Sequence, residues 1–164
     1  MKTKTAIIYS DDNNRLAQAV AKGAYEADGD VRLRHVPEPS IESAPRGIPE
    51  ASPEDLEWAD TILIGTSARS GLPSAHLLAF LEDCAHQSWT VKVVSSFACS
   101  TKTEGERDCA LQVLTMMLCR RDCIFIPPSF SSNAEVRADI ERARQQGRRT
   151  VSIARQLISG RLRS

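Results

Sequence analysis

The sequence predicts an α/β fold in which helices cover both faces of a parallel sheet. One observation is a set of short apolar segments without polar alternation, which is typical of strands buried on both faces. A second is that helical patterns, with apolar residues spaced by three and four, separate these segments along the chain. Strands and helices that alternate in this way fold through right-handed crossovers into a doubly wound sheet.

Five segments are predicted to be strands. Four are runs of β-branched or other apolar residues, at 5–9, 61–64, 91–94 and 123–126. The fifth, 31–36, alternates apolar residues with Arg32 and Arg34, which indicates a half-exposed strand at an edge of the sheet.

Helices are predicted between and after these strands. The long ones are expected from Asn13 or Asn14 to 27, from 73 to 84, from 105 or 106 to 120, and from 136 to 158. Pro73 suits a first helical turn, and Gly160 suits the position just after the last helix. Five of the 8 prolines lie within 37–53, so this segment is expected to be an extended connection into a short helix capped by Ser52.

Composition and charge exclude several classes of function. At 164 residues the chain is expected to form one domain over 1–164, with a core that needs no disulfide or metal. Lys+Arg and Asp+Glu are equal at 21 each, so no broad positive field attracts nucleic acid or an anionic membrane. The apolar run 6–9 is too short for a signal peptide or a membrane span, so a cytoplasmic location is expected.

The 5 cysteines are expected to be reduced thiols, because their odd number comes without an export signal. Most are interpreted as small buried hydrophobes, and their spacing does not complete a zinc site. Met116 and Met117 are also interpreted as core residues. Cys99 lies ahead of a helix start near Lys102, so a reactive thiol and an ordinary loop thiol both stay open. The histidines form no recognisable triad order with a serine or cysteine, which leaves hydrolase chemistry without support.

A ligand of a doubly wound sheet binds beyond the carboxyl ends of the strands, where the strand order reverses. Three predicted connections meet there: 10–15, 66–72 and 96–104. The first joins a strand directly to a helix N-terminus, whose unpaired N–H groups and dipole favour an anion such as a phosphate. A helix start that caps itself and needs no ligand is the alternative.

Four stretches that cover most of the chain are similar to a known family: IIYSDDNNRLAQAVAKGA, WADTILIGTSARSGLPSAHLLAFLED, VKVVSSF and IERARQQGRRTVSIARQL. They resemble the matching stretches of the WrbA-type NAD(P)H:quinone oxidoreductases, which have the flavodoxin-like fold. The most specific part is GTSARSGLPS, which is similar to the family's GTPTRFGNMS, the loop that cradles the flavin ring. Its matching residues are Gly65, Thr66, Arg69, Gly71 and Ser74.

The resemblance implies a five-stranded parallel sheet of order 2-1-3-4-5 and an FMN-dependent enzyme. Such an enzyme takes hydride from NAD(P)H and passes two electrons to a quinone or a similar small acceptor, and FMN itself supplies the chemistry, so no side chain is expected to be a catalytic acid or base. By the same resemblance, 10–15 would hold the FMN phosphate and 66–71 the isoalloxazine. The candidate cofactor-binding residues are Ser10, Asn13, Asn14, Arg15, Thr66, Ser67, Ala68, Arg69, Ser70, Gly71, Ser96, Phe97, Ala98 and Cys99.

The sequence also departs from the family in ways that affect the site. Asp11 and Asp12 stand in the phosphate loop where the family has neutral residues, and their charges would repel a phosphate. The Gly-rich third loop of the family becomes a stretch with side chains, in which Phe97 is expected to stack on a flat ring. The family's insertion after the last strand is missing, so a homodimer or a monomer is expected.

These departures keep a second hypothesis open. In it, the chain is a flavodoxin-like domain that has lost FMN and acts as a binding or regulatory protein, or on another small molecule. Arg69 would then be a surface cation or the partner of a nearby carbonyl group. The basic C-terminal run is interpreted as the solvated face of the last helix, because no aromatic residues are interleaved with it for nucleic-acid contact.

Overall fold

A computed structural model describes the chain apart from residues 1, 11–12, 40–46, 100–102, 129–135 and 162–164. Its strands and helices alternate along the sequence as predicted. In chain order they are β1 (Thr3–Ser10), α1 (Asn14–Glu26), β2 (Gly29–Val36), α2 (Pro53–Trp58), β3 (Thr61–Arg69), β4 (Leu72–Pro73), α3 (Ala75–Asp83), β5 (Val93–Cys99), α4 (Glu104–Cys119), β6 (Ile124–Ile126) and α5 (Val136–Arg161).

The main sheet is parallel and has the order β2-β1-β3-β5-β6. This is the predicted order 2-1-3-4-5, so the prediction of a doubly wound, flavodoxin-like sheet is confirmed. A sixth strand, β4, was not predicted; it pairs antiparallel with the end of β3. The strand order reverses between β1 and β3, and this point places the predicted ligand site at their carboxyl ends.

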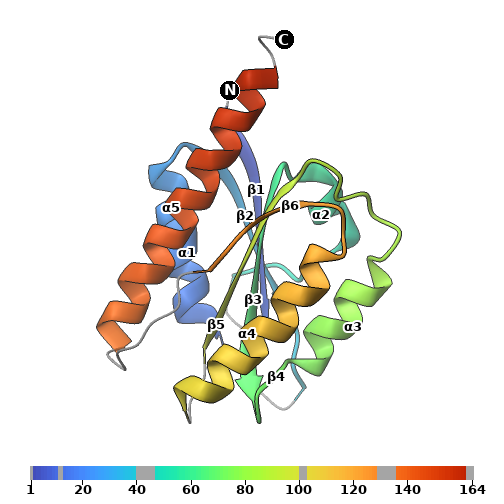
Figure 1. The fold of residues 1–164 in the computed structure, drawn as a ribbon, viewed down its shortest axis with the longest axis vertical. Coiled ribbons are helices and arrows are strands. Elements are labelled where there is room, and N and C mark those ends of the chain that lie inside the picture. Colours follow the sequence, from blue (N-terminus) through green and yellow to red (C-terminus); the bar gives the residue numbers. More distant parts are fainter. Residues whose placement is uncertain (1, 11–12, 40–46, 100–102, 129–135, 162–164) are drawn as a thin grey trace.

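Two apolar layers cover the sheet, because successive strand residues point to opposite faces. Ile7 packs with α1 and α5, whereas its neighbour Ile8 packs with α2, α3 and α4. Figure 1 shows α1 and α5 on one side of the sheet and α3 and α4 on the other. Strands β1, β3 and β5 are buried on both faces, which explains why their sequences lack polar alternation, whereas the edge strand β2 is partly exposed over 31–34.

Helices α1 and α5 pack through two glycines at their contact. A Cβ atom on Gly23 would lie 1.8 Å from the carbonyl oxygen of Arg144, and one on Gly147 would lie 2.1 Å from that of Val20. Both obstacles are backbone atoms, which cannot rotate away as a side chain can. These glycines therefore allow the close approach of the two helices.

Polar side chains cap three helices, and the sequence predicted the one at Ser52. Ser52 and Asp55 form a capping box at α2. The hydroxyl of Ser74 accepts a hydrogen bond from Leu77 N–H at α3, and that of Thr103 accepts from Glu106 N–H at α4.

Several predicted boundaries differ from the structure, including the following three. Helix α3 begins at Ala75, because Pro73 belongs to β4. Strand β5 begins at Val93, because Val91 lies in a turn with φ 63, where it cannot continue a strand. Helix α5 continues through Gly160, so this glycine does not end it.

Burial also corrects the interpretation of the sulfur residues. Cys84 is buried, whereas Cys109 and Cys119 are exposed and Cys99 and Cys123 are intermediate. Met116, expected in the core, is 67 % exposed. The reason is helical phase: α4 packs inward through Ala110, Leu111, Leu114 and Leu118, and the exposed residues lie outside that face.

Candidate functional site

The predicted ligand site lies where β1, β3 and β5 end side by side. Parallel register places Tyr9 of β1 beside Gly65 of β3, and Ser67 of β3 beside Cys99 of β5. The segment predicted as a loop at 66–72 is instead the end of β3 followed by a tight hairpin into β4. Ser70 and Gly71 form the turn with φ values of 52 and 78, the left-handed conformation that a short hairpin requires. The β3–β4 hairpin therefore borders the predicted ligand site at the carboxyl end of β3.

Buried hydroxyl groups join the first strand to the third. Ser67 N–H donates to Ser10 Oγ at 2.8 Å, and Ser10 Oγ donates to Ser67 Oγ at 3.3 Å. Ser74 N–H donates to Thr66 Oγ1 at 2.9 Å, and Thr66 Oγ1 donates to the carbonyl oxygen of Ser67 at 3.0 Å. These three predicted site residues, Ser10, Thr66 and Ser67, are thus brought together, but their hydroxyls are bonded within the protein.

Asn13 and Asn14, at the start of α1, make different contacts. Asn13 is the N-cap residue and is buried, and its Nδ2 donates to the carbonyl oxygen of Thr66 at 3.0 Å. Its Oδ1 is buried without a hydrogen-bond partner among the described residues, and its side chain does not cap the helix. Asn14 Oδ1 accepts from the hydroxyl of Tyr9 at 2.9 Å. The first turn of α1 is therefore not capped by Asn13, and Arg15 is exposed beside it.

Asp11 and Asp12 lie outside the described residues, as do 100–102 of the third connection. The predicted repulsion of a phosphate by the two aspartates therefore stays a prediction.

Arg69 forms an ion pair that sequence reasoning missed. Its Nη2 lies 3.3 Å from Oε2 of Glu38, and Glu38 is buried while the Arg69 side chain is exposed. Glu38 follows β2 in the proline-rich connection, where no periodicity marks a buried carboxylate. Arg69 thus contributes a positive charge at the hairpin that a carboxylate already balances in part. Ala68 belongs to the same hairpin, where it pairs with Pro73 and is buried.

Phe97 is a core residue and not a ligand platform. It is 5 % exposed and packs with the cluster that includes Tyr9, Leu63 and Ala143. A Cβ on Gly65 would lie 2.4 Å from the Phe97 ring, so the absence of a side chain at Gly65 makes room for this ring. The expectation that Phe97 stacks on a flat ligand is corrected, because its ring is already covered by the protein. Its neighbours Ser96 and Ala98 are buried too, and only Cys99 is partly accessible.

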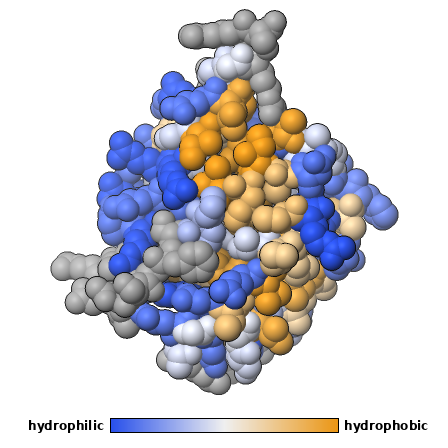
Figure 2. Space-filling model, in the orientation of Figure 1, coloured by the Kyte–Doolittle hydropathy of each residue, from blue (hydrophilic) through white to orange (hydrophobic). Residues whose placement is uncertain are grey.

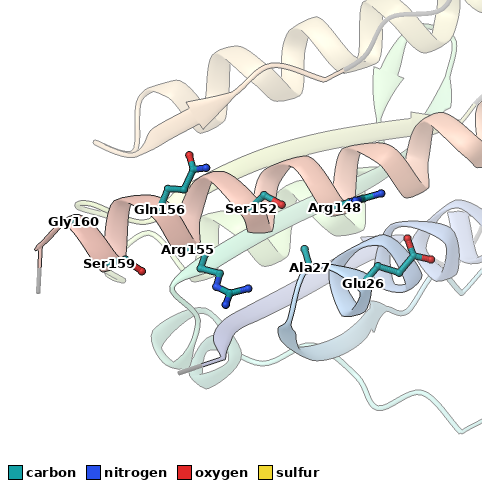
Figure 3. Close-up of a pocket in the computed structure, with 8 residues that line it drawn as sticks. All are labelled: Glu26, Ala27, Arg148, Ser152, Arg155, Gln156, Ser159 and Gly160. Atoms are coloured by element: carbon teal, nitrogen blue, oxygen red, sulfur yellow. The ribbon is translucent and has the colours of Figure 1, made fainter.

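Cavities beside and opposite the predicted site differ in size. A cavity of about 50 Å³ lies at the end of β5, lined by Ser96, Phe97 and Ala98 together with charged residues of α4 and α5. Cavities of about 610 and 460 Å³ lie at the opposite, amino-terminal edge of the sheet. Figure 3 shows the larger one, between the end of α5 and the turn after α1, where Arg148 and Arg155 stand near Glu26 and Ala27. Ligand pockets usually enclose about 300–1,000 Å³, so the small cavity does not by itself hold a cofactor.

The thiols and Lys92 have distinct environments. Burial raises the pKa of Cys84 to about 11 and that of Cys123 to about 11 as well. Burial also lowers the pKa of Lys92, whose Nζ donates to the carbonyl oxygens of Glu57 and Ala59.

Among the described residues, no group of three or more His, Cys, Asp or Glu side chains could hold a metal ion. Within the same part of the chain, every helix is too short or too polar to cross a membrane.

Comparisons with solved structures show which known fold the chain shares. A WrbA-like flavodoxin from Agrobacterium tumefaciens superimposes with a TM-score of 0.74 at 24 % identity, over 94 % of this chain and 99 % of that one. A flavodoxin from the domain Archaea gives 0.68 at 14 % identity, over 93 % and 99 %. The chain therefore has the flavodoxin-like fold.

Curated relatives are similar to the chain in sequence as well. The chain is 28 % identical over 140 residues to an NAD(P)H dehydrogenase (quinone) of Brucella anthropi, covering 78 % of this chain and 70 % of the relative. It is 29 % identical over 123 residues to a flavodoxin of Aquifex aeolicus, covering 70 % of this chain and only 60 % of that protein. No protein-family model matches the chain. Within the flavodoxin-like proteins, the chain resembles the WrbA-type NAD(P)H:quinone oxidoreductases, as the sequence predicts.

Proposed function

We propose that this chain is an FMN-dependent oxidoreductase that transfers electrons from NAD(P)H to a quinone or a similar small acceptor. The similarity to relatives named NAD(P)H dehydrogenase (quinone) supports the reaction class. The observation that carries the proposal is the start of α1, where the Asn13 side chain does not cap the helix and the buried Asn13 Oδ1 has no partner among the described residues.

The start of α1 fits the phosphate and ribityl end of FMN. The N–H groups of a helix start and the positive end of its dipole favour a phosphate, and the exposed Arg15 adds a cation. A buried acceptor without a partner is costly, and a ribityl hydroxyl would supply the donor that Asn13 Oδ1 lacks. The backbone of the Arg69–Gly71 turn would form the wall beside the ring, with the partly accessible Cys99 opposite.

Bound FMN would accept hydride and return electrons in pairs, and this chain's own residues would bind and orient it. The buried bonds of Ser10 and Ser67 hold β1 against β3, and so fix the helix start relative to the hairpin. Glu38 holds Arg69 across the hairpin. These are positioning roles, because all of these contacts lie within the protein.

A second candidate function rests on a different observation. The hydroxyls of Ser10, Thr66 and Ser67 are bonded within the protein, and the cavity lined by Ser96 and Phe97 measures only about 50 Å³. In a flavodoxin-like domain that has lost FMN and serves as a binding or regulatory protein, we expect the polar groups at the carboxyl ends of the strands to bond within the protein in this way.

Two matched arginine variants separate these functions. Arg15→Gln removes the cation at the start of α1, and Arg149→Gln removes another exposed cation, on α5, that is not among the predicted site residues. A charge-assisted contact to phosphate is worth about 1.5–3 kcal/mol, so Arg15→Gln should weaken FMN binding at least about tenfold. Arg149→Gln should leave the dissociation constant unchanged. Equal effects of the two variants would contradict the proposed phosphate site.

The reaction itself is tested by NAD(P)H oxidation with a soluble quinone, with and without added FMN. FMN-dependent turnover that saturates with quinone supports the enzyme. If the protein binds no FMN and oxidises no NAD(P)H, the second candidate replaces the first.

A further inference from the structure

The cavity between α5 and the end of α1 has no part in the proposed function. It measures about 610 Å³, which is within the range of ligand pockets, and it lies at the amino-terminal edge of the sheet (Figure 3). Figure 2 shows hydrophilic surface along the side of α5 that faces α1 in Figure 1, whereas apolar surface lies on the other side of its C-terminal half. Among the described residues, none of the large exposed hydrophobic side chains lines the cavity. It therefore suits a polar ligand.

Hydrogen-bond donors line the α5 side of this cavity. Arg148, Ser152, Arg155 and Ser159 follow one another at spacings of three and four, so they share one side of the helix, and Gln156 lies beside them. We call these five residues the α5 donor row. Arg148 and Arg155 are about 10 Å apart along the helix axis, because a helix rises about 1.5 Å per residue. The α5 donor row thus presents two cations with neutral polar groups between and beside them.

The carboxylates on either side of Ala27 are already paired. Arg144 Nε lies 3.0 Å from both carboxylate oxygens of Glu26, and its Nη1 also lies 2.9 Å from Glu141 on the same helix. Arg155 Nη1 lies 2.7 Å from Oδ2 of Asp28. The side chains of this second pair are 52 % and 63 % exposed, so the pair contributes little to stability. Asp28 shows that Arg155 holds an anionic oxygen in this position, and a ligand can take its place.

Arg148 differs from these two arginines, because it has no carboxylate partner among the described residues. Its charge therefore makes the cavity attractive to an anion. The negative end of the α1 dipole lies nearby and opposes an anion, but a helix end changes affinity only about two- to fivefold. A charge-assisted contact to a guanidinium group changes affinity about tenfold or more. The guanidinium group decides the sign of the charge that the cavity prefers.

We propose that the α5 donor row binds a small polyol with two phosphate groups, of the kind of a sugar bisphosphate. Arg148 and Arg155 each bind one phosphate, since a guanidinium group matches phosphate oxygens in charge and geometry. The side chains of Ser152, Gln156 and Ser159 bind the hydroxyl groups, because they offer donors and acceptors together. A phosphoinositide headgroup has the same chemistry, but the polar lining of the cavity favours a soluble ligand. The proposal does not depend on FMN.

NMR titration of the unmodified chain tests the ligand class. Fructose 1,6-bisphosphate should shift the backbone amides of 26–28 and 148–160 and saturate with a dissociation constant below about 1 mM. Fructose 6-phosphate should bind at least about tenfold more weakly, because it reaches only one guanidinium group, and fructose should not bind. Equal affinity for the two phosphates, or no saturable shift at about 10 mM bisphosphate, would overturn the proposal. Binding to vesicles with a phosphoinositide bisphosphate, without binding to the sugar bisphosphate, would overturn it too.

Matched arginine variants test the unpaired cation. Arg148→Gln should weaken binding of the bisphosphate at least about tenfold. Arg149→Gln is the control, because Arg149 is the next residue and is exposed as well, but it does not line the cavity. It should leave the dissociation constant unchanged. Equal effects of the two variants would show that only overall charge matters and would overturn the site.

A variant that gains affinity tests the second cation. Asp28→Asn removes the carboxylate that competes for Arg155, and asparagine tolerates the left-handed backbone of this position, where φ is 62. This variant should bind the bisphosphate about threefold more tightly or better, and the additional substitution Arg155→Gln should abolish the gain. A purely structural role of Asp28 would not strengthen binding. Unchanged or weaker binding by Asp28→Asn would overturn the two-cation site.

Discussion

Replacing Gly147 by alanine tests the packing that holds α5 against α1. The new methyl group would lie 2.1 Å from the carbonyl oxygen of Val20 and 2.9 Å from its carbonyl carbon, well inside van der Waals contact. Since both atoms are backbone, relief requires the two helices to move apart. Overpacking of this kind costs about 1–3 kcal/mol, and rigid backbone obstacles favour the upper end.

The higher helix propensity of alanine offsets part of this loss of stability. Alanine is better than glycine inside a helix by about 1 kcal/mol, so the expected net loss for Gly147→Ala is about 2 kcal/mol. For a domain of this size, that lowers the melting temperature by roughly 4–8 °C. Gly160→Ala on the same helix is the matched control, because a Cβ there meets nothing within 4 Å and only the gain in propensity remains.

The assay is urea unfolding followed by circular dichroism, with thermal melting as a second measurement. Gly147→Ala should unfold at lower urea with an unchanged slope, and Gly160→Ala at equal or higher urea. If Gly147→Ala proves as stable as Gly160→Ala, the close approach of α1 and α5 is not a feature of the folded protein.

Other predictions concern a charged contact and the thiols. Asp55→Ala removes the capping box of α2 and leaves Arg32 and Arg34 without their shared carboxylate, so urea unfolding should show a loss of about 2–4 kcal/mol; a loss below about 0.5 kcal/mol would contradict this role. Cys84 should react with a disulfide reagent far more slowly than the exposed Cys109 at pH 8, because burial raises its pKa to about 11 and reduces the thiolate fraction. Its rate should rise with pH up to about 11, and equal rates at pH 8 would contradict the burial.

Much of the fold could be predicted from the sequence, because strong local patterns determine it. Unbroken apolar runs identified the buried strands, and the strand–helix alternation together with the family resemblance gave the sheet order. The predicted boundaries of strands and helices were wrong where a residue fits two kinds of secondary structure. Pro73 fits both the first turn of a helix and a short strand, and the β-branched Val91 favours a strand although its backbone adopts φ 63.

The candidate site was less predictable, because its contacts join distant segments. Proximity of Ser10 to Ser67 follows from the sheet order, but the sequence does not show that their hydroxyls bond to each other. The same holds for Glu38 and Arg69, which come from different connections. The exposure of Met116 was within reach of sequence reasoning, since it is out of phase with Leu111 and Leu114.

The most direct test is a calorimetric titration of FMN into the purified chain. The proposed function predicts saturable binding of one FMN per chain, weakened by Arg15→Gln and strengthened when Asp11→Ser and Asp12→Thr together remove the predicted repulsion. Absence of any heat of binding at 100 μM FMN, for the unmodified chain and for the doubly substituted one, would contradict it.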